Sequence, residues 1–460
     1  MKTNIILFSI ISTLCMLCYS GCSKSPSTEE PQPEPNDTIP APVDYTIRGQ
    51  ILSLPENYSL LKTILKQSGL SETLADTTQS YTFFIQDNAD FATADIYSIG
   101  DLLAKLHAAT PEVTSDSLLP ARFIAYRTIS GAIETDSLFK MSELETLVAG
   151  EKIFLSKDYS DPQSTLKIND LNGHLTAPDA TLDSASEYSN LRCSNGIIHK
   201  IDGNLWIKKR KPYRIYWDIA EQPEIMALPN FRQPGCHADY NAGELSEIKW
   251  QEAPMCPWIY PQICYYCGTM PQDISAFNEK SQYVYGDYLR FNLDPFAIQW
   301  IEFKTPVLIG SDEGVEYKVW ICYRRELECD MKTTFKQDGY DDQIMPDIFD
   351  TSIYLPDPYA GGNTPETIEQ EGWKIYNAKK YNSVVCSHLL GTVKVYATGR
   401  HILRLEPTSN IRVEQQGSFD MIQFIPVDED QLWPRVDMLG KWIGADVEEC
   451  NIFPYEECGQ

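Results

Sequence analysis

Positive charge is scarce in this sequence, which has 38 lysine and arginine residues against 65 aspartate and glutamate residues and a formal net charge of −27. Because an acidic field repels phosphate backbones, we expect no nucleic-acid partner. The signatures of common catalytic sites are also absent: no Gly-x-Ser-x-Gly elbow, phosphate-binding loop, His-Glu-x-x-His pair or dinucleotide-binding glycine pattern occurs. We therefore predict no enzymatic activity, although nothing in one sequence selects a pair of glycosidase carboxylates from so many acids.

The length and composition indicate more than one folded unit. A chain of 460 residues with 43% hydrophobic and 22% charged residues is too large for one ordinary core and too apolar to be disordered. Its 26 tyrosines and 9 tryptophans are typical of β-rich extracellular domains, in which stiff amphipathic side chains cover sheets. We expect two globular units outside the cytoplasm.

Only the N-terminus carries a long apolar run. Lys2 precedes the run Ile5–Leu17, whose helix would reach only about 20 Å and could not span a membrane, so residues 1–21 are predicted to be a signal peptide. The Tyr-Ser-Gly-Cys run that ends at Cys22 resembles a bacterial lipobox, which implies that Cys22 is acylated and anchors the mature chain in the outer membrane. A plain secreted protein is the alternative.

Residues 22–44 follow as a spacer. They are rich in proline and acids and offer nothing to bury, which predicts an extended tether between the lipid and the first folded unit. Acids soon after the lipidated cysteine also resemble signals that send some lipoproteins to the outer face of the outer membrane. We expect display at the cell surface, with the periplasmic face as the alternative.

Two short runs in the first folded unit carry a specific resemblance. The runs Tyr81–Phe91 (YTFFIQDNADF) and Asn195–Leu205 (NGIIHKIDGNL) resemble the two conserved boxes of fasciclin (FAS1) domains. The resemblance implies an α+β FAS1 domain over residues 45–207. The box residues that we interpret as structural are Thr82, Phe83, Asp87, Asn88, Phe91, Asn195, Gly196, His199 and Asp202.

The residue types in these boxes favour a structural role over chemistry. Asn195-Gly196 is a turn signal that leads into an apolar strand, and Asp87 and Asn88 suit side chains that hold a turn. His199 has no second ligand at metal-binding spacing, so we interpret it as a core or strand-face histidine and not as an acid–base or metal group.

A basic segment separates the two units. Residues 208–214 (KKRKPYR) hold five basic residues in an otherwise acidic chain. Such a run suits either a patch for anionic glycans and lipid headgroups or a solvated connector between domains. We favour the connector.

The second unit, residues 208–440, alternates like strands with apolar residues on both faces, as in Tyr317–Arg324, and predicts an antiparallel all-β sandwich. The run Gly391–Glu406, followed by Phe419–Pro426, is similar to the closing strands of galactose-binding-like carbohydrate-binding modules, and Trp300–Pro306 to a central strand. That resemblance implies a jelly-roll and permits carbohydrate binding. Residues 441–460 form a tail that contains cysteines.

A stretch rich in proline and cysteine supplies the candidate ligand-binding residues. Aromatic side chains in loops can stack on the flat faces of sugar rings, and this stretch lacks strand alternation. The candidates are Trp258, Tyr260, Tyr265 and Tyr266. The alternative is that these four residues form a small core at the edge of the sandwich.

Metal sites are weakly indicated. Cys264-x-x-Cys267, with Cys236, His237 and Cys256 upstream, could bind zinc, but local disulfides or buried thiols would explain the same spacing. We predict no metal site, with Cys264 and Cys267 as the weak candidates. A loop with Asp338, Asp341, Asp342, Asp347 and Asp350 could hold a structural Ca²⁺ ion, but a solvated acidic loop is the simpler interpretation.

These features together predict a non-catalytic, lipid-anchored binding or adhesion protein on the bacterial cell surface. The FAS1 domain and the sandwich would contact an extracellular glycan or a surface protein. The alternatives are an extracellular glycan hydrolase, an accessory subunit of a surface glycan-uptake complex, and a purely structural assembly subunit.

Overall fold

The computed structural model describes residues 44–111, 113, 115–159, 161, 163–171, 177–254, 261–268, 283–324, 330–346, 349–353, 355–356, 361–377, 385–408, 417–437 and 439–445. The predicted signal peptide, Cys22, Cys256, Trp258, Tyr260 and Asp347 lie outside these residues, as does most of the tail. None of the helices in the described ranges has the length and apolar character needed to cross a membrane. We call residues 44–207 the N-terminal region and residues 208–445 the C-terminal region.

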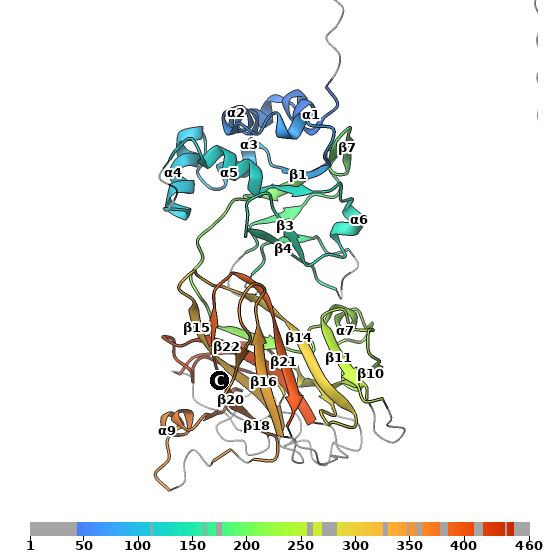
Figure 1. The fold of residues 1–460 in the computed structure, drawn as a ribbon, viewed down its shortest axis with the longest axis vertical. Coiled ribbons are helices and arrows are strands. Elements are labelled where there is room, and N and C mark those ends of the chain that lie inside the picture. Colours follow the sequence, from blue (N-terminus) through green and yellow to red (C-terminus); the bar gives the residue numbers. More distant parts are fainter. Residues whose placement is uncertain are drawn as a thin grey trace, which may run out of the picture. The chain divides into compact units, whose positions relative to one another are not determined.

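Most helices of the N-terminal region gather on one side of its sheet (Figure 1), whereas α6 (Thr135–Leu138) packs its Leu138 into the cluster on the opposite face. Leu61, Ile64 and Leu65 are buried in one cluster together with Leu102 and Leu106. The helical elements are α1 (Ile47–Ser53), η1 (Glu56–Tyr58), α2 (Ser59–Ser68), η2 (Thr73–Ala75), α3 (Asn88–Ala92), α4 (Ile99–Ala109), α5 (Leu119–Tyr126) and α6 (Thr135–Leu138).

The sheet of this region is buried on both faces at its centre. Phe83 packs into the cluster under the helices, whereas Phe84 packs into a second cluster on the opposite face, which explains the uninterrupted apolar run of β1. The strand order is β2 (Thr128–Ser130), β1 (Tyr81–Ile85), β8 (Gly196–Gly203), β6 (Ala180–Leu182), β5 (Lys167–Ile168), β4 (Lys152–Ser156) and β3 (Glu143–Glu145), and β7 (Leu191–Cys193) also pairs with β8.

The two conserved boxes meet in this sheet, because β1 and β8 pair in parallel. At the start of β8 the buried Asn195 accepts a hydrogen bond from the Ile47 N–H at 2.8 Å and donates to the carbonyls of Leu74 at 2.9 Å and Asp76 at 3.1 Å. Gly196 has φ +147°, and a Cβ there would lie 1.9 Å from the Tyr81 carbonyl oxygen. The Asn-Gly pair therefore joins α1, η2 and the two central strands.

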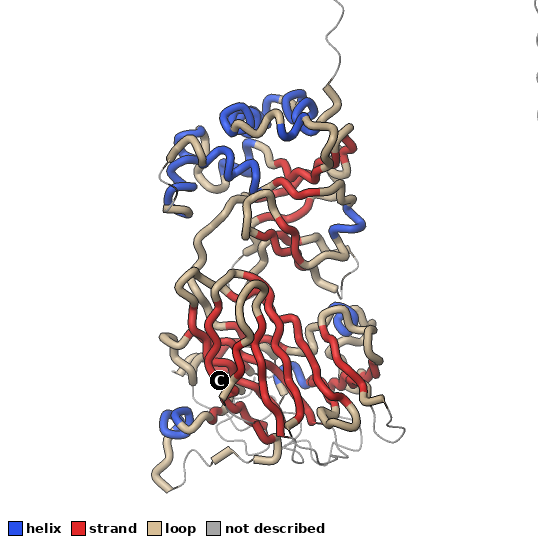
Figure 2. The backbone as a smooth tube through the Cα atoms, viewed as in Figure 1, coloured by secondary structure: helices blue, strands red, loops and turns tan. Residues whose placement is uncertain are grey.

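The C-terminal region is mostly sheet (Figure 2). The first of its two large sheets, the β12 sheet, has the order β10 (His237–Tyr240), β12 (Ile263–Cys267), β13 (Asp287–Phe291), β22 (Gly417–Pro426), β15 (Val315–Arg324), β20 (Val385–Val395) and β19 (Trp373–Lys374), and β9 (Ile215–Asp218) also pairs with β22. The second, the β14 sheet, has the order β11 (Ile248–Glu252), β14 (Ile298–Leu308), β21 (Gly399–Pro407), β16 (Asp330–Lys336) and β17 (Gln343–Ile344), and β18 (Phe349–Asp350) also pairs with β16.

The remaining elements of this region are short. They are α7 (Pro223–Met226), η4 (Val284–Gly286), α9 (Pro365–Gln370), β23 (Arg435–Val436) and β24 (Trp442–Ile443).

One hydrophobic core lies between the two large sheets. Phe291 and Phe419 of the β12 sheet belong to the same cluster as Phe303 of the β14 sheet, and the rings of Phe291 and Phe303 have centroids 6.1 Å apart. Trp320, on the opposite face of β15 from this core, is also fully buried. The strand pairs within both sheets are antiparallel, in agreement with the predicted β-sandwich.

The secondary structure around Tyr265 differs from the one that the sequence predicted. We expected no strand there, but Ile263–Cys267 forms β12 between β10 and β13. Ile263, Tyr265 and Cys267 belong to the core between the sheets, whereas Tyr266 lies on the other face. The strand was missed because it is only five residues long and lies in a stretch rich in proline and cysteine.

We predict that Asn195→Ala destabilises the N-terminal region by about 1–3 kcal/mol, because the buried Ile47 N–H and Leu74 carbonyl lose their partner. Hydrogen exchange of peptides from β1 and β8, followed by mass spectrometry, measures the free energy of opening. Asn57→Ala, at an exposed position of η1, is the matched control and should leave exchange unchanged. Equal exchange in both variants would refute the proposed role of the Asn195 side chain.

Candidate functional site

The acidic and amide residues of the first box hold the turn after β1. The Asp87 carboxylate caps α3 by accepting hydrogen bonds from the N–H groups of Ala89 at 2.9 Å and Asp90 at 3.0 Å. Asn88 accepts from the Leu60 N–H at 3.2 Å, which links α3 to α2. These side chains satisfy backbone groups at the starts of α2 and α3.

The other box residues are likewise engaged within the N-terminal region. The Thr82 hydroxyl donates to the Gly131 carbonyl at 2.7 Å, and Asp202 pairs with Lys200 at 2.9 Å. Phe83 and Phe91 are fully buried. None of these contacts leads to a ligand.

His199 is a buried histidine with both ring nitrogens in use. Its Nε2–H donates to the Ile133 carbonyl at 2.8 Å, and its Nδ1 accepts from the Asn190 N–H at 3.4 Å. Burial lowers the pKa of the imidazole, although the hydrogen bond to Ile133 opposes this shift. The ring is thus held neutral in the sheet.

The described members of the predicted aromatic quartet do not present ring faces to solvent. Tyr265 is fully buried, so its prediction as a ligand-binding residue is wrong. Tyr266 lies between His237 and Tyr288, with ring centroids 4.5 Å and 5.6 Å away, and both pairs are stacked. Because these neighbours cover the faces of Tyr266, the ring suits a cross-strand ladder better than a sugar.

Cys264 and Cys267 do not form a ligand pair. Successive strand residues point to opposite faces, so a separation of three places the two thiols on opposite sides of β12. Cys267 and Cys236 belong to the core between the sheets, whereas Cys264 does not. Within the described ranges, the one group of possible metal ligands is instead His237, Asp239 and Cys264, and the acids of the 338–350 loop form no such group.

The segment between the two regions has paired cations. Lys208 and Arg210 each lie 2.7 Å from Asp179, and Arg214 lies 2.6 Å from Glu429. These ion pairs support the interpretation of residues 208–214 as a connector.

An outward-facing surface of the β14 sheet was not singled out from the sequence. The Trp300 Nε1–H donates to Gln251 at 2.6 Å, and the Arg404 guanidinium lies 4.4 Å from the centre of the indole. Glu302 accepts hydrogen bonds from Arg404 at 3.0 Å and Lys336 at 2.8 Å, and these bonds lower its pKa although burial opposes the shift. We call these five residues the Trp300 surface.

The Trp300 surface combines an indole with ionised groups that can donate to and accept from hydroxyls. Core residues Ile301 and Phe303 alternate with Trp300 and Glu302, which places the latter pair on the outer face. Such a combination suits a polar ligand with flat apolar faces, as sugars have. The sequence around Trp300 did not predict this surface, because Gln251, Arg404 and Lys336 come from three other strands.

A cluster of buried carboxyl groups in the β12 sheet was also missed. Arg232 lies 2.6 Å from Asp218 and 3.5 Å from Asp287, and its guanidinium stacks 3.4 Å from the ring centre of Tyr285. Asp420 accepts from the Tyr376 hydroxyl at 2.5 Å. An acid flanked by apolar strand residues, as in Trp-Asp-Ile and Phe-Asp-Met, is the sequence signal for this cluster.

Burial dominates the electrostatics of this cluster. Burial raises the pKa of Asp287 to about 7 although Arg232 lowers it, and burial together with neighbouring carboxylates raises the pKa values of Asp218 and Asp420. One oxygen each of Asp287 and Asp420 is buried without a hydrogen-bond partner among the described residues. Burial therefore favours the protonated, neutral form of these carboxyl groups.

We predict that Asp287→Asn makes the C-terminal region less sensitive to pH. The folded state holds a proton on Asp287 up to about pH 7, whereas the unfolded chain loses it near the ordinary value of 3.8, so this group stabilises the fold at low pH and stops doing so as the pH rises towards 7. Between pH 5 and pH 8 the wild type should lose about 2 kcal/mol more than the variant.

Urea unfolding followed by hydrogen exchange of β13 and β22 peptides measures this difference. The matched control is Asp312→Asn, at an exposed position, which should follow the wild type at both pH values. Parallel pH dependence in wild type and Asp287→Asn would contradict a raised pKa at this position.

Comparisons with solved structures give slight similarities. Residues of this chain are similar to a FAS1 domain pair from the insect cell adhesion molecule fasciclin I, with 16% identity, 35% of this chain and 50% of that chain covered, and a TM-score of 0.25. The chain thus spans half the length of that structure. These similarities are too slight to support a functional argument.

Two glycan-degrading enzymes with carbohydrate-binding modules are also similar. For the GH26-CBM35 β-(1,4)-mannanase of Podospora anserina the identity is 10%, with 44% of this chain and 31% of that chain covered and a TM-score of 0.15. For the CBM22-1–GH10 modules of Clostridium thermocellum endo-1,4-β-D-xylanase 10B the identity is 10%, with 48% and 30% covered and a TM-score of 0.21.

A comparison with curated proteins finds no match. The fasciclin domain family model, in contrast, matches residues 56–206, a range that includes both conserved boxes and the parallel pair of β1 and β8. The resemblance of the two boxes is thereby confirmed. Residues 56–206 of this chain form a fasciclin domain.

Proposed function

We propose that this chain is a non-catalytic, lipid-anchored binding protein of the adhesion type on the surface of a bacterial outer membrane. The fasciclin domain at residues 56–206 is the observation that carries the proposal, because fasciclin domains are known in adhesion proteins. The acyl group on Cys22 holds the chain, and the proline-rich segment up to residue 44 separates the lipid from the domains.

The C-terminal region is the recognition module in this proposal. Its strands form a galactose-binding-like jelly-roll, and the Trp300 surface contacts an extracellular glycan or a surface protein. The support is the indole of Trp300 beside Arg404 and Glu302 on the outer face of the β14 sheet. The aromatic ring supplies apolar contact area, and the charged groups fix orientation.

We predict that Cys22→Ala releases the protein from the membrane fraction, because the variant lacks the thiol that would be acylated. Fractionation of cells and immunoblotting measure the distribution. Cys18→Ala, which changes a cysteine within the signal peptide, is the matched control and should remain with membranes. Equal membrane retention of Cys22→Ala and the parent would refute lipid anchoring.

We predict that Trp300→Ala weakens binding by a factor of ten or more, equivalent to about 1.4 kcal/mol, towards whichever partner the parent retains. A glycan array and capture of bacterial surface proteins identify that partner. Tyr97→Ala, at a position that is 73% exposed in the fasciclin domain, is the control and should bind like the parent.

Two outcomes of this experiment would count against the proposal in different ways. If the parent retains no polysaccharide and no surface protein, the recognition function is wrong. If Trp300→Ala binds like the parent, recognition stands but lies elsewhere on the chain.

A further inference from the structure

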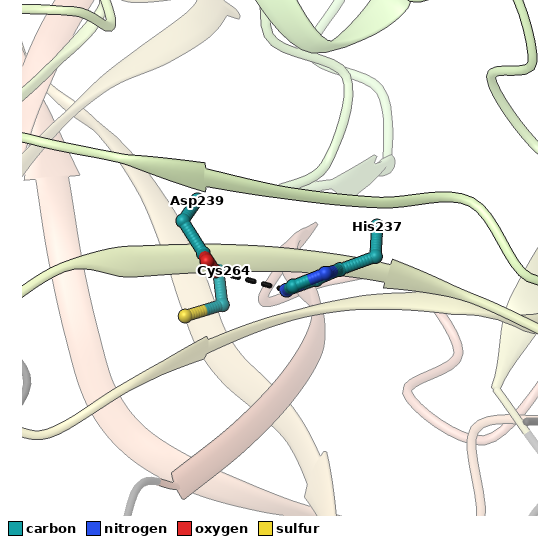
Figure 3. Close-up of side chains that lie close together, drawn as sticks. All are labelled: His237, Asp239 and Cys264. Atoms are coloured by element: carbon teal, nitrogen blue, oxygen red, sulfur yellow. Dashed lines mark hydrogen bonds and ion pairs between the residues drawn. The ribbon is translucent and has the colours of Figure 1, made fainter.

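Three side chains of different chemistry converge at the β10 edge of the β12 sheet. Figure 3 shows His237 and Asp239 on one strand, joined by a hydrogen bond, and Cys264 beside them on the next strand. His237 Nε2 lies 2.9 Å from Asp239 Oδ1, and ligand atoms from all three residues lie within 4.8 Å of one another. None of the three residues belongs to the fasciclin domain or to the five residues of the Trp300 surface.

Strand register explains this convergence. His237 and Asp239 are two residues apart on β10, so their side chains share one face of the sheet. Asp239 is directly opposite Cys264 in the antiparallel pair of β10 and β12, which places the thiol on the same face. The opposite face holds Cys236 and Cys267 in the core, so those two thiols are not part of the group.

The set of donor atoms selects a class of metal ion. Imidazole nitrogen, carboxylate oxygen and thiolate sulfur together suit a borderline ion such as Zn²⁺, whereas Ca²⁺ and Mg²⁺ prefer oxygen alone. In a tetrahedral zinc site with bonds of about 2.0–2.3 Å, ligand atoms lie about 3.3–3.7 Å apart. Here His237 and Asp239 are 2.9 Å apart and all three ligand atoms lie within 4.8 Å of one another, so the side chains would adjust when an ion binds.

We propose that His237, Asp239 and Cys264 bind one Zn²⁺ ion, with water in the fourth position. The ion replaces the direct hydrogen bond between His237 and Asp239 and neutralises the carboxylate and the thiolate. The His237 and Asp239 side chains are 39% and 44% exposed, so solvent reaches the site.

Neighbouring residues position the ligands before an ion arrives. Tyr266, directly opposite His237, stacks on the imidazole with ring centroids 4.5 Å apart, and Tyr288 stacks behind Tyr266. Cys264 is held by the hydrogen-bonded pairing of β12 with both β10 and β13. Such support limits the freedom that the ligands lose on binding.

Zinc at this site would stabilise the pairing of an edge strand with its neighbour. β10 is at the end of the strand order and pairs only with β12 among the described strands. An ion bound to both strands adds its binding free energy to the pairing, since the unfolded chain has no preformed site.

The test is a titration of the purified full chain with ZnCl₂ under a non-thiol reductant, after treatment with a chelator and its removal. Isothermal calorimetry should give one ion per chain, and Co²⁺ in place of Zn²⁺ should give a sulfur-to-metal absorption band. His237→Ala, Asp239→Asn and Cys264→Ala should each weaken Zn²⁺ binding tenfold or more. Cys267→Ala, three residues along the same strand and on the other face, is the matched control and should bind like the wild type.

Circular dichroism and hydrogen exchange of β13 peptides should show that every variant is folded. A folded wild type that binds no Zn²⁺ would overturn the proposal. Binding that persists unchanged in His237→Ala and Cys264→Ala, or that is lost in Cys267→Ala with the fold intact, would place the metal elsewhere and overturn it as well.

Discussion

The antiparallel register between β10 and β12 is the constraint on which the chemistry of the C-terminal region depends. It places Asp239 opposite Cys264 and His237 opposite Tyr266. A shift by one residue would exchange the two faces of β12 and move Tyr265 out of the core. The same register therefore buries one set of side chains, stacks the ring ladder on the other face and gathers three potential metal ligands at the sheet edge.

The sequence carried enough information for the elements whose periodicity is strong. The two conserved boxes indicated the fasciclin domain, and the alternation in β15 and β22 indicated a sandwich. The strand β12 was missed because it has only five residues and lies in a stretch rich in proline and cysteine, whereas the run of β15 is twice as long. Pairing between β10 and β12 is not local, and residue spacing therefore grouped Cys264 with Cys267 and His237 but did not single out Asp239.

The cluster of buried carboxyl groups is a second feature that the local sequence did not predict. Asp218, Asp287 and Asp420 come from three strands, and only the folded sheet brings them to the neighbourhood of Arg232. In the sequence each is one acid among many. Their raised pKa values follow from burial and mutual repulsion, which links the stability of the sandwich to pH. In the proposed function, the fasciclin domain is a docking scaffold and the Trp300 surface belongs to the recognition module.

Anomalous diffraction from crystals grown with Zn²⁺, recorded on both sides of the zinc absorption edge, tests the register and its chemical consequence most directly. The account predicts one peak about 2.0–2.3 Å from a ring nitrogen of His237, a carboxylate oxygen of Asp239 and the sulfur of Cys264. A peak bound instead to Cys236 or Cys267, or Cys264 turned into the core in the refined structure, would contradict it.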